Sequence, residues 1–297
     1  MLAGVAVALV VTGCGGSTPS AEPDPSPSIS TLTPLPMPDM GPPAGKLVAD
    51  LRQASRDSAL GRFQVWIGNG LPHDINPTSV RYLDPRFRAP IPGERLRPNP
   101  SDAERGYPLP LPPRPRCDVR PTSEAPGRVA MTFDGRQVRI PVEDEADVVA
   151  RYVASRCLEL AVARVAELSF ADEVPVDGSG KGSTGTLVLV ARPTGRPGAV
   201  TVDSVGGTPV LTARGSTSWE PHVTVHGTDP VRRIELSVVP NRCDDHAFLE
   251  AGSATAFIVR LHLDKRAGGR SGGLIVRMSD EGAANAIRFA RDSCGLG

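Results

Sequence analysis

The sequence predicts a mainly β protein of α+β type, built from two tandem β-sandwich domains of immunoglobulin-like kind. Three observations indicate this fold. Short runs that alternate apolar and polar residues are separated by Gly, Pro and Asn turn signals, which is typical of sandwiches. One pattern of two strands, a helix and two cysteines occurs twice. The cysteines occupy matching places in the two copies, so each domain is expected to carry one short helix and one disulfide.

The chain begins with an apolar segment that ends at a cysteine. Residues 1–11 are almost continuously apolar, Thr12-Gly13-Cys14 follows, and polar, Pro-rich sequence comes next. This arrangement resembles a bacterial lipobox, in which the signal peptide, here residues 1–13, is removed and Cys14 carries lipid such as palmitate. The run is shorter than the roughly 20 apolar residues that span a bilayer. We therefore expect export and lipid anchoring at the extracellular side of the cell membrane. The alternative is a short buried apolar N-terminus with an incidental cysteine.

Residues 14–45 are predicted to form a disordered tether after the lipidated Cys14. Nine prolines lie between residues 15 and 43, among many Ser and Thr and few apolar side chains. Such a composition buries too little apolar surface to offset its ordering entropy. At about 3.1 Å per residue, the prolines would let the tether reach roughly 90 Å from the lipid.

Composition limits the partners. The chain has 33 basic and 33 acidic residues and no net charge. This argues against a nucleic-acid partner, which needs a basic face, and against a polybasic membrane patch. The expected partners are the membrane, through the N-terminal lipid, and an envelope protein or wall polymer. No cofactor motif is present, so no cofactor is predicted.

The first domain is assigned to residues 46–161. Apolar residues at helical spacing predict a lead-in helix over residues 46–59. Alternation then predicts strands over residues 63–67 and 78–83. The Pro-rich run at 108–115 is interpreted as a rigid connector that ends at Cys117, the alternative being a ligand for a domain that recognises polyproline.

The repeated pattern defines the second domain, residues 162–297. In the first copy, Cys117 precedes strands at 128–133 and 137–142 and a helix near 144–156. In the second copy, Cys243 precedes strands at 255–263 and 273–278 and a helix near 280–292. The helix ends ARYVASRC and IRFARDSC align without a gap, which places Arg151 opposite Arg288. We interpret this as an internal duplication.

The cysteines other than Cys14 are even in number: Cys117, Cys157, Cys243 and Cys294. Four cysteines allow three pairings. Their matching positions favour pairing within each copy, Cys117 with Cys157 and Cys243 with Cys294. A zinc site would require closer pairs than these. The Trp and Tyr that mark true immunoglobulin domains are absent from their usual places beside the cysteines, which argues against strict immunoglobulin topology.

Several segments together carry a family resemblance: LVADLRQASRDSALGRFQVWIGNG, LDPRF, RGYPLPLP and RCDDHAFLE. The chain resembles a group of uncharacterised exported lipoproteins of high-GC Gram-positive bacteria. The resemblance covers most of residues 47–297. It implies a shared fold, but it carries no functional residue over. The pattern RCDxHAxxE of that group is matched by Arg242, Cys243, Asp244, His246, Ala247 and Glu250.

Asp244, His246 and Glu250 form the strongest polar cluster. As a functional site they would bind a metal or another ligand, or act as acid and base; as a structural feature, Asp244 would cap a turn beside the disulfide. No G-x-S-x-G nucleophile motif occurs. Trp66 and Trp219 would be either exposed ligand contacts or packing residues. We therefore predict no catalytic residue and a non-catalytic binding or scaffolding protein. The alternatives are a metal-dependent hydrolase and a transporter-associated binding protein.

Overall fold

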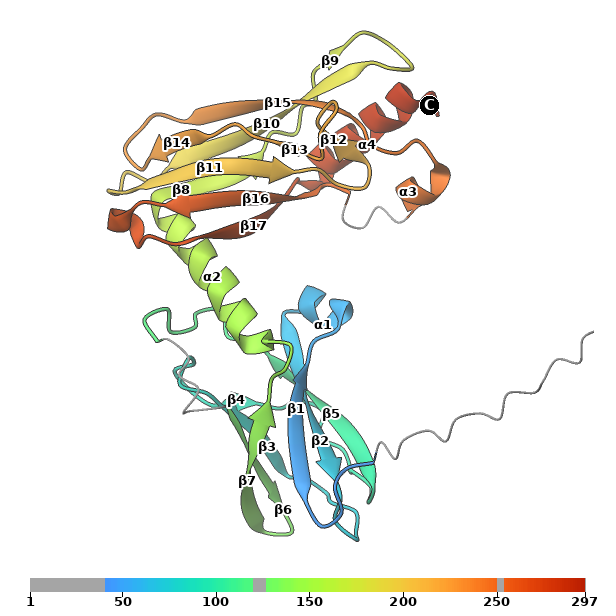
Figure 1. Cartoon of the computed structure of the whole chain (residues 1–297), viewed down its shortest axis with the longest axis vertical. Coiled ribbons are helices and arrows are strands. Elements are labelled where there is room, and N and C mark those ends of the chain that lie inside the picture. Colours follow the sequence, from blue (N-terminus) through green and yellow to red (C-terminus); the bar gives the residue numbers. More distant parts are fainter. Residues whose placement is uncertain (1–40, 120–126, 250–253, 297) are drawn as a thin grey trace, which may run out of the picture. The chain divides into compact units, whose positions relative to one another are not determined.

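The computed structural model describes residues 41–119, 127–249 and 254–296 (Figure 1). Strands make up 43% of the structure and helices 18%, which confirms the mainly β prediction. The predicted signal peptide, Cys14 and residues 15–40 of the tether lie outside the described residues. Within the described part of the chain, no helix is long and apolar enough to cross a membrane.

The strands of the first domain form one continuous hydrogen-bonded set. Its order is β4-β3-β6-β7-β1-β2-β5. All contacts are antiparallel except the short parallel pairing of β1 with β7, at Ala49–Val142 and Asp50–Glu143. The strands are β1 (Leu47–Arg52), β2 (Arg62–Asn69), β3 (Ser79–Leu83), β4 (Ile91–Pro92), β5 (Ala103–Pro110), β6 (Arg128–Phe133) and β7 (Arg136–Glu143).

The lead-in helix predicted over residues 46–59 is wrong. Leu47–Arg52 is strand β1, and only Ser55–Ala59 forms a helix, α1. β1 pairs with β2 from Leu47 opposite Asn69 to Arg52 opposite Gln64, so neighbouring strands satisfy its backbone groups. Ala49 and Leu51 are buried in the first core. Ala49 and Leu51 therefore lie on the buried face of a strand, two residues apart. Hydrogen bonding to neighbouring strands outweighs the helical spacing of the apolar residues.

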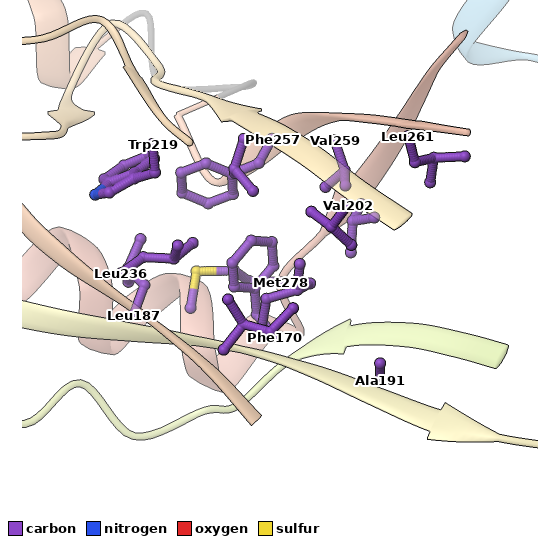
Figure 2. Close-up of a cluster of buried hydrophobic side chains, with 14 of the residues drawn as sticks. Phe170, Leu187, Ala191, Val202, Trp219, Leu236, Phe257, Val259, Leu261 and Met278 are labelled. Atoms are coloured by element: carbon purple, nitrogen blue, oxygen red, sulfur yellow. The ribbon is translucent and has the colours of Figure 1, made fainter. Parts of the chain in front are cut away.

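Two sheets build the second domain. One has the order β12-β15-β10-β8, with β9 beside β10; the other has the order β13-β11-β16-β17, with β14 beside β11. Figure 2 shows Phe170 and Leu187 of the first sheet facing Val202 and Phe257 of the second. The strands are β8 (Ala166–Phe170), β9 (Val176–Asp177), β10 (Thr184–Pro193), β11 (Ala199–Gly206), β12 (Leu211–Thr212), β13 (Ser218–Trp219), β14 (Val223–His226), β15 (Arg232–Pro240), β16 (Ala256–Leu263) and β17 (Ser271–Arg277).

The two domains share one strand order, which supports the duplication. β1-β2-β5 corresponds to β8-β10-β15, and β3-β6-β7 corresponds to β11-β16-β17. In the second domain this order, with β12 added beside β15, is the ABED and CFG arrangement of immunoglobulin domains. The missing Trp and Tyr markers argued against strict immunoglobulin topology, but the observed strand order is close to it. Strand pairing does not depend on those marker residues.

Helices follow the last strand of each domain. α2 (Val148–Val165) follows β7 and α4 (Asp280–Cys294) follows β17. α2 is longer than the predicted segment 144–156 and runs through the predicted domain boundary at 161–162. Val153 and Cys157 belong to the first hydrophobic cluster, whereas Leu158 belongs to the second. The helix continues because apolar residues at helical spacing remain buried beyond Cys157.

Both predicted disulfides are present. Cys117 bonds to Cys157 and Cys243 to Cys294, with Cα–Cα distances of 5.6 and 5.3 Å. Each bond joins the segment before the last hairpin to the helix after it. An immunoglobulin disulfide instead links the two sheets through strands B and F. Here the bond holds a terminal helix against its own sandwich.

Candidate binding grooves

The polar cluster at the second disulfide is a helix cap in the structure. Asp244 precedes the short helix α3 (Asp245–Leu249) and accepts a hydrogen bond of 3.0 Å from the backbone N–H of Ala247. It also accepts one of 2.9 Å from Nε of Arg242. The Ala247 N–H and, after it, the Arg242 guanidinium hold the pKa of the Asp244 carboxyl below its usual value. This geometry matches the structural alternative for Asp244.

The structure describes only one of the other two members of that cluster. His246 lies exposed on α3, and Glu250 lies outside the described residues. In the segments 41–119, 127–249 and 254–296, no group of three or more His, Cys, Asp or Glu side chains is placed to hold a metal ion.

The two tryptophans have different surroundings. Trp219 is buried in the second core (Figure 2). Its indole N–H donates a 2.6 Å hydrogen bond to the carbonyl of Ser237. Trp66 is half-buried on β2, and the guanidinium of Arg52 lies 4.6 Å from its ring centroid. Trp219 is therefore a packing residue, and Trp66 is covered by a charged side chain.

Two carboxylates hold Arg52 over Trp66. Its guanidinium lies 2.6 Å from Asp50 and 3.0 Å from Glu104. Burial lowers the pKa of Arg52, but the hydrogen bonds to Asp50 and Glu104 outweigh burial and raise the pKa above its usual value. A ligand could stack on Trp66 only after displacing this ion cluster, so the indole is a poor ligand contact.

The Pro-rich run before Cys117 is bound to its own domain. The Tyr152 hydroxyl donates a hydrogen bond to the Pro112 carbonyl, and Nε of Arg156 donates one of 2.8 Å to the Pro113 carbonyl. Polyproline ligands are recognised through accessible carbonyls and ring faces. Two of the carbonyls are already occupied here, which argues against a polyproline ligand. The connector is shorter than predicted, because residues 108–110 pair with β2 as the end of strand β5.

A groove lies beside α2 in the first domain and has a volume of about 450 Å³. We call it the first groove. Its walls are α2, the segment between β1 and β2, and the Pro-rich connector. The residues that matter for its chemistry are Gln53, Ser58, Leu111, Pro113, Arg151 and Ser155.

A second groove lies beside α4 in the second domain, with a volume of about 390 Å³. Its other wall is the segment between β8 and β10, the counterparts of β1 and β2. Both grooves are therefore formed by the terminal helix and the link between the first two long strands. The residues that matter here are Glu173, Val176, Arg288, Phe289 and Asp292.

The lining residues of the two grooves align in sequence. Arg151 corresponds to Arg288, and Ser155 corresponds to Asp292. The alignment of the helix ends in the sequence pairs the arginines, but it gives no sign of a groove. Only the packing of each helix against a segment about 90 or more residues earlier creates the groove walls.

The two grooves differ in charge. The first has two arginines and one glutamate in its walls, and the second has one arginine and two carboxylates, Glu173 and Asp292. Arg156 of the first groove is engaged by Glu159 at 2.5 Å. Arg288 of the second donates a 3.1 Å hydrogen bond to Asn285.

No family model matches this chain, and no curated protein matches it. Among solved structures, it is similar to red sea bream transglutaminase at 14% identity and a TM-score of 0.21, with 79% of this chain and 31% of the transglutaminase covered. It is also similar to the YadV chaperone at 11% identity and a TM-score of 0.17, with 74% and 94% covered. The chain thus spans less than a third of the transglutaminase. Likenesses with TM-scores this low carry no argument about fold or function.

Proposed function

We propose that this protein is a lipid-anchored lipoprotein of the cell surface whose two immunoglobulin-like domains form a non-catalytic binding or scaffolding module. The duplicated groove carries the proposal. The two domains, whose long strands follow the same order, each have a groove at the same position. A shared fold by itself specifies no function, so the argument rests on these sites rather than on the topology.

Two further observations support the location. The Thr12-Gly13-Cys14 motif and the Pro-rich segment after it suit a lipid anchor and spacer. Both disulfides suit an oxidising compartment outside the cytoplasm. On this proposal the chain belongs with the exported lipoproteins that share the RCDxHAxxE pattern, and its partner is an envelope protein or a wall polymer.

The competing hydrolase hypothesis requires Asp244 to act as a ligand or base. Asp244 already accepts hydrogen bonds from Ala247 and Arg242, which supports its role as a cap. Elemental analysis of the purified chain separates the two ideas, together with an activity screen of wild type and His246→Ala. A stoichiometric metal and a hydrolysis lost in His246→Ala would favour the enzyme. An adjacent permease gene would favour the transporter-associated alternative.

The binding proposal is tested by chemical crosslinking in intact cells, followed by pull-down of the full chain. We expect the same envelope component to be recovered in repeated experiments. A chain with Cys14→Ser, which should leave the membrane, is the control for contacts that depend on location. Failure to recover any component from intact cells would contradict a binding or scaffolding role.

A further inference from the structure

Arg151 presents an unpaired positive charge to the first groove. It is exposed on α2, and among the residues that the structure describes no hydrogen bond or ion pair reaches its guanidinium. Its neighbour Arg156 differs, because Glu159 and the Pro113 carbonyl engage it. Of the two arginines in the first groove, Arg151 is therefore the one ready to bind an anion.

Polar side chains line the same groove as this guanidinium. Ser155 follows Arg151 by four residues on α2, and side chains four apart lie next to each other on a helix. Ser58 and Gln53 contribute to the opposite wall, where the Gln53 amide already donates one hydrogen bond of 2.9 Å to the Arg62 carbonyl and keeps a second N–H. Hydroxyl and amide groups can donate hydrogen bonds to an oxyanion, and a guanidinium can bind a carboxylate with two parallel hydrogen bonds. The first groove thus offers one charged hydrogen-bond donor, the guanidinium, and several neutral donors that form weaker hydrogen bonds.

The remaining wall is apolar. Leu111 and Pro113 of the connector line the groove. Leu60 lies between the lining residues Ser58 and Gly61, and 56% of its surface is exposed. An exposed leucine beside a groove suits an apolar side chain of a ligand. A ligand that combines a single carboxylate with apolar neighbours therefore fits these walls.

We propose that the first groove binds an acidic, partly apolar peptide segment of a partner protein, with its carboxylate paired to Arg151, and that the second groove does not. This inference rests on the proposed binding function and specifies its site. A polyanionic wall polymer would require a row of free cations, as other polyanions do. The first groove supplies one free guanidinium, which favours a peptide.

The second groove carries charged residues that disfavour a carboxylate ligand. Asp292 replaces Ser155, and Glu173 stands in the facing wall. These two carboxylates repel the carboxylate of an incoming ligand, because placing like charges side by side is strongly unfavourable in a complex. The two grooves therefore lie at equivalent positions but carry opposite balances of charged residues.

The test uses the full chain with Cys14→Ser and ¹⁵N-labelled arginine side chains, observed by NMR. The probe is acetyl-Leu-Glu-Leu amide, and its neutral match is acetyl-Leu-Gln-Leu amide. We expect the Arg151 signal to shift and saturate with the acidic probe, with at least about tenfold weaker binding of the neutral probe, as loss of a charge-assisted hydrogen bond implies. Arg151→Gln should abolish binding, whereas Arg288→Gln should leave it unchanged.

Substitutions that swap the charged and neutral residues of the two grooves give a second test. Ser155→Asp should remove binding from the first groove. Asp292→Ser combined with Glu173→Gln should create binding that shifts the Arg288 signal. Equal binding of both probes, loss of binding in Arg288→Gln, or a response to sodium polyphosphate in place of the acidic probe would each overturn the proposal.

Failure of this site is distinguishable from failure of the binding function. If crosslinking recovers an envelope component equally with wild type and Arg151→Gln, the chain is a binder but the first groove is not its site. If the acidic probe binds but crosslinking recovers nothing, the site is correct and the proposed cellular role is wrong.

Discussion

Asp84 and Arg86 form a two-pronged ion pair in the first sandwich. Nε of Arg86 lies 2.8 Å from Oδ1 of Asp84, and Nη2 lies 2.6 Å from Oδ2. The Tyr82 hydroxyl donates a further hydrogen bond of 2.9 Å to Asp84. The side chains of Asp84 and Arg86 are only 1% and 10% exposed, so solvent screens this pair little.

Replacing Asp84 should therefore destabilise the first domain. Asp84→Asn leaves a nearly buried guanidinium without its counter-charge, and such losses cost about 3–5 kcal/mol. Urea unfolding at pH 7 measures the change in the free energy of unfolding. The control is Asp118→Asn, which removes an exposed partner 3.6 Å from Arg116 and should have no measurable effect. Equal effects of the two substitutions on the free energy of unfolding would contradict a stabilising role of the Asp84–Arg86 ion pair.

The same pair should make stability depend on pH. Burial raises the pKa of the Asp84 carboxyl, but the hydrogen bonds from Arg86 outweigh burial and hold the pKa below its usual value. In the unfolded chain the pKa is about 3.9. The stabilisation is thus present above that pH and is lost as the pH falls through the lower folded pKa. The difference between wild type and Asp84→Asn should shrink between pH 5 and pH 2, and a constant difference would exclude this mechanism.

Gly185 on β10 lies against the ring of Phe289 on α4. A Cβ atom at Gly185 would lie 2.9 Å from Cζ of Phe289, closer than side chains tolerate. Gly185→Ala should push α4 away from the sheet and cost about 1–3 kcal/mol, as overpacking does. The control is Gly206→Ala in the same domain, where the nearest atom would be 3.6 Å away. Thermal unfolding of both variants should show a lower melting temperature for Gly185→Ala alone.

The two disulfides should contribute similarly to stability. They close segments of 40 and 51 residues, and the chain-entropy model assigns about 4 kcal/mol to each loop. Replacing both cysteines of one pair by serine should lower the free energy of unfolding by about that amount in either domain. A peptide map under non-reducing conditions checks the pairing itself. A peptide linking Cys157 to Cys243 would contradict the structure and the duplication together.

The proposed anchor predicts where the protein is found. Wild type should enter the detergent phase after cloud-point separation with Triton X-114, because two or more acyl chains hold a protein in the membrane stably. Cys14→Ser should move to the aqueous phase and fail to incorporate labelled palmitate. Retention of Cys14→Ser in the detergent phase would indicate that the chain associates with membranes by another route.

Much of the fold could be predicted from local pattern. The strand prediction at residues 128–133 matches β6, and the helix near 280–292 matches α4 within two residues at its end. Period-two alternation and a Ser279 cap with acidic residues after it are local signals. The disulfide pairing was also predictable, because the cysteines recur in matching copies.

Two elements were decided by tertiary contacts. Residues 47–52 carry apolar side chains that fit a helix or a strand, and pairing with β2 and β7 selects the strand. α2 extends to Val165 because Val162 and Val165 are buried by the second core. Neither the pairing partner nor the second core can be read from these residues alone.

The β-rich class, the cysteine pairing and the alignment of Arg151 with Arg288 could be read from the amino-acid sequence alone. These follow from spacing and order along one chain. Three features became visible only in the folded chain: Asp244 caps a helix, Arg52 covers Trp66, and the helix after each domain's last strand borders a groove. A groove and its charge depend on which distant segments pack together, and short-range patterns do not encode that packing.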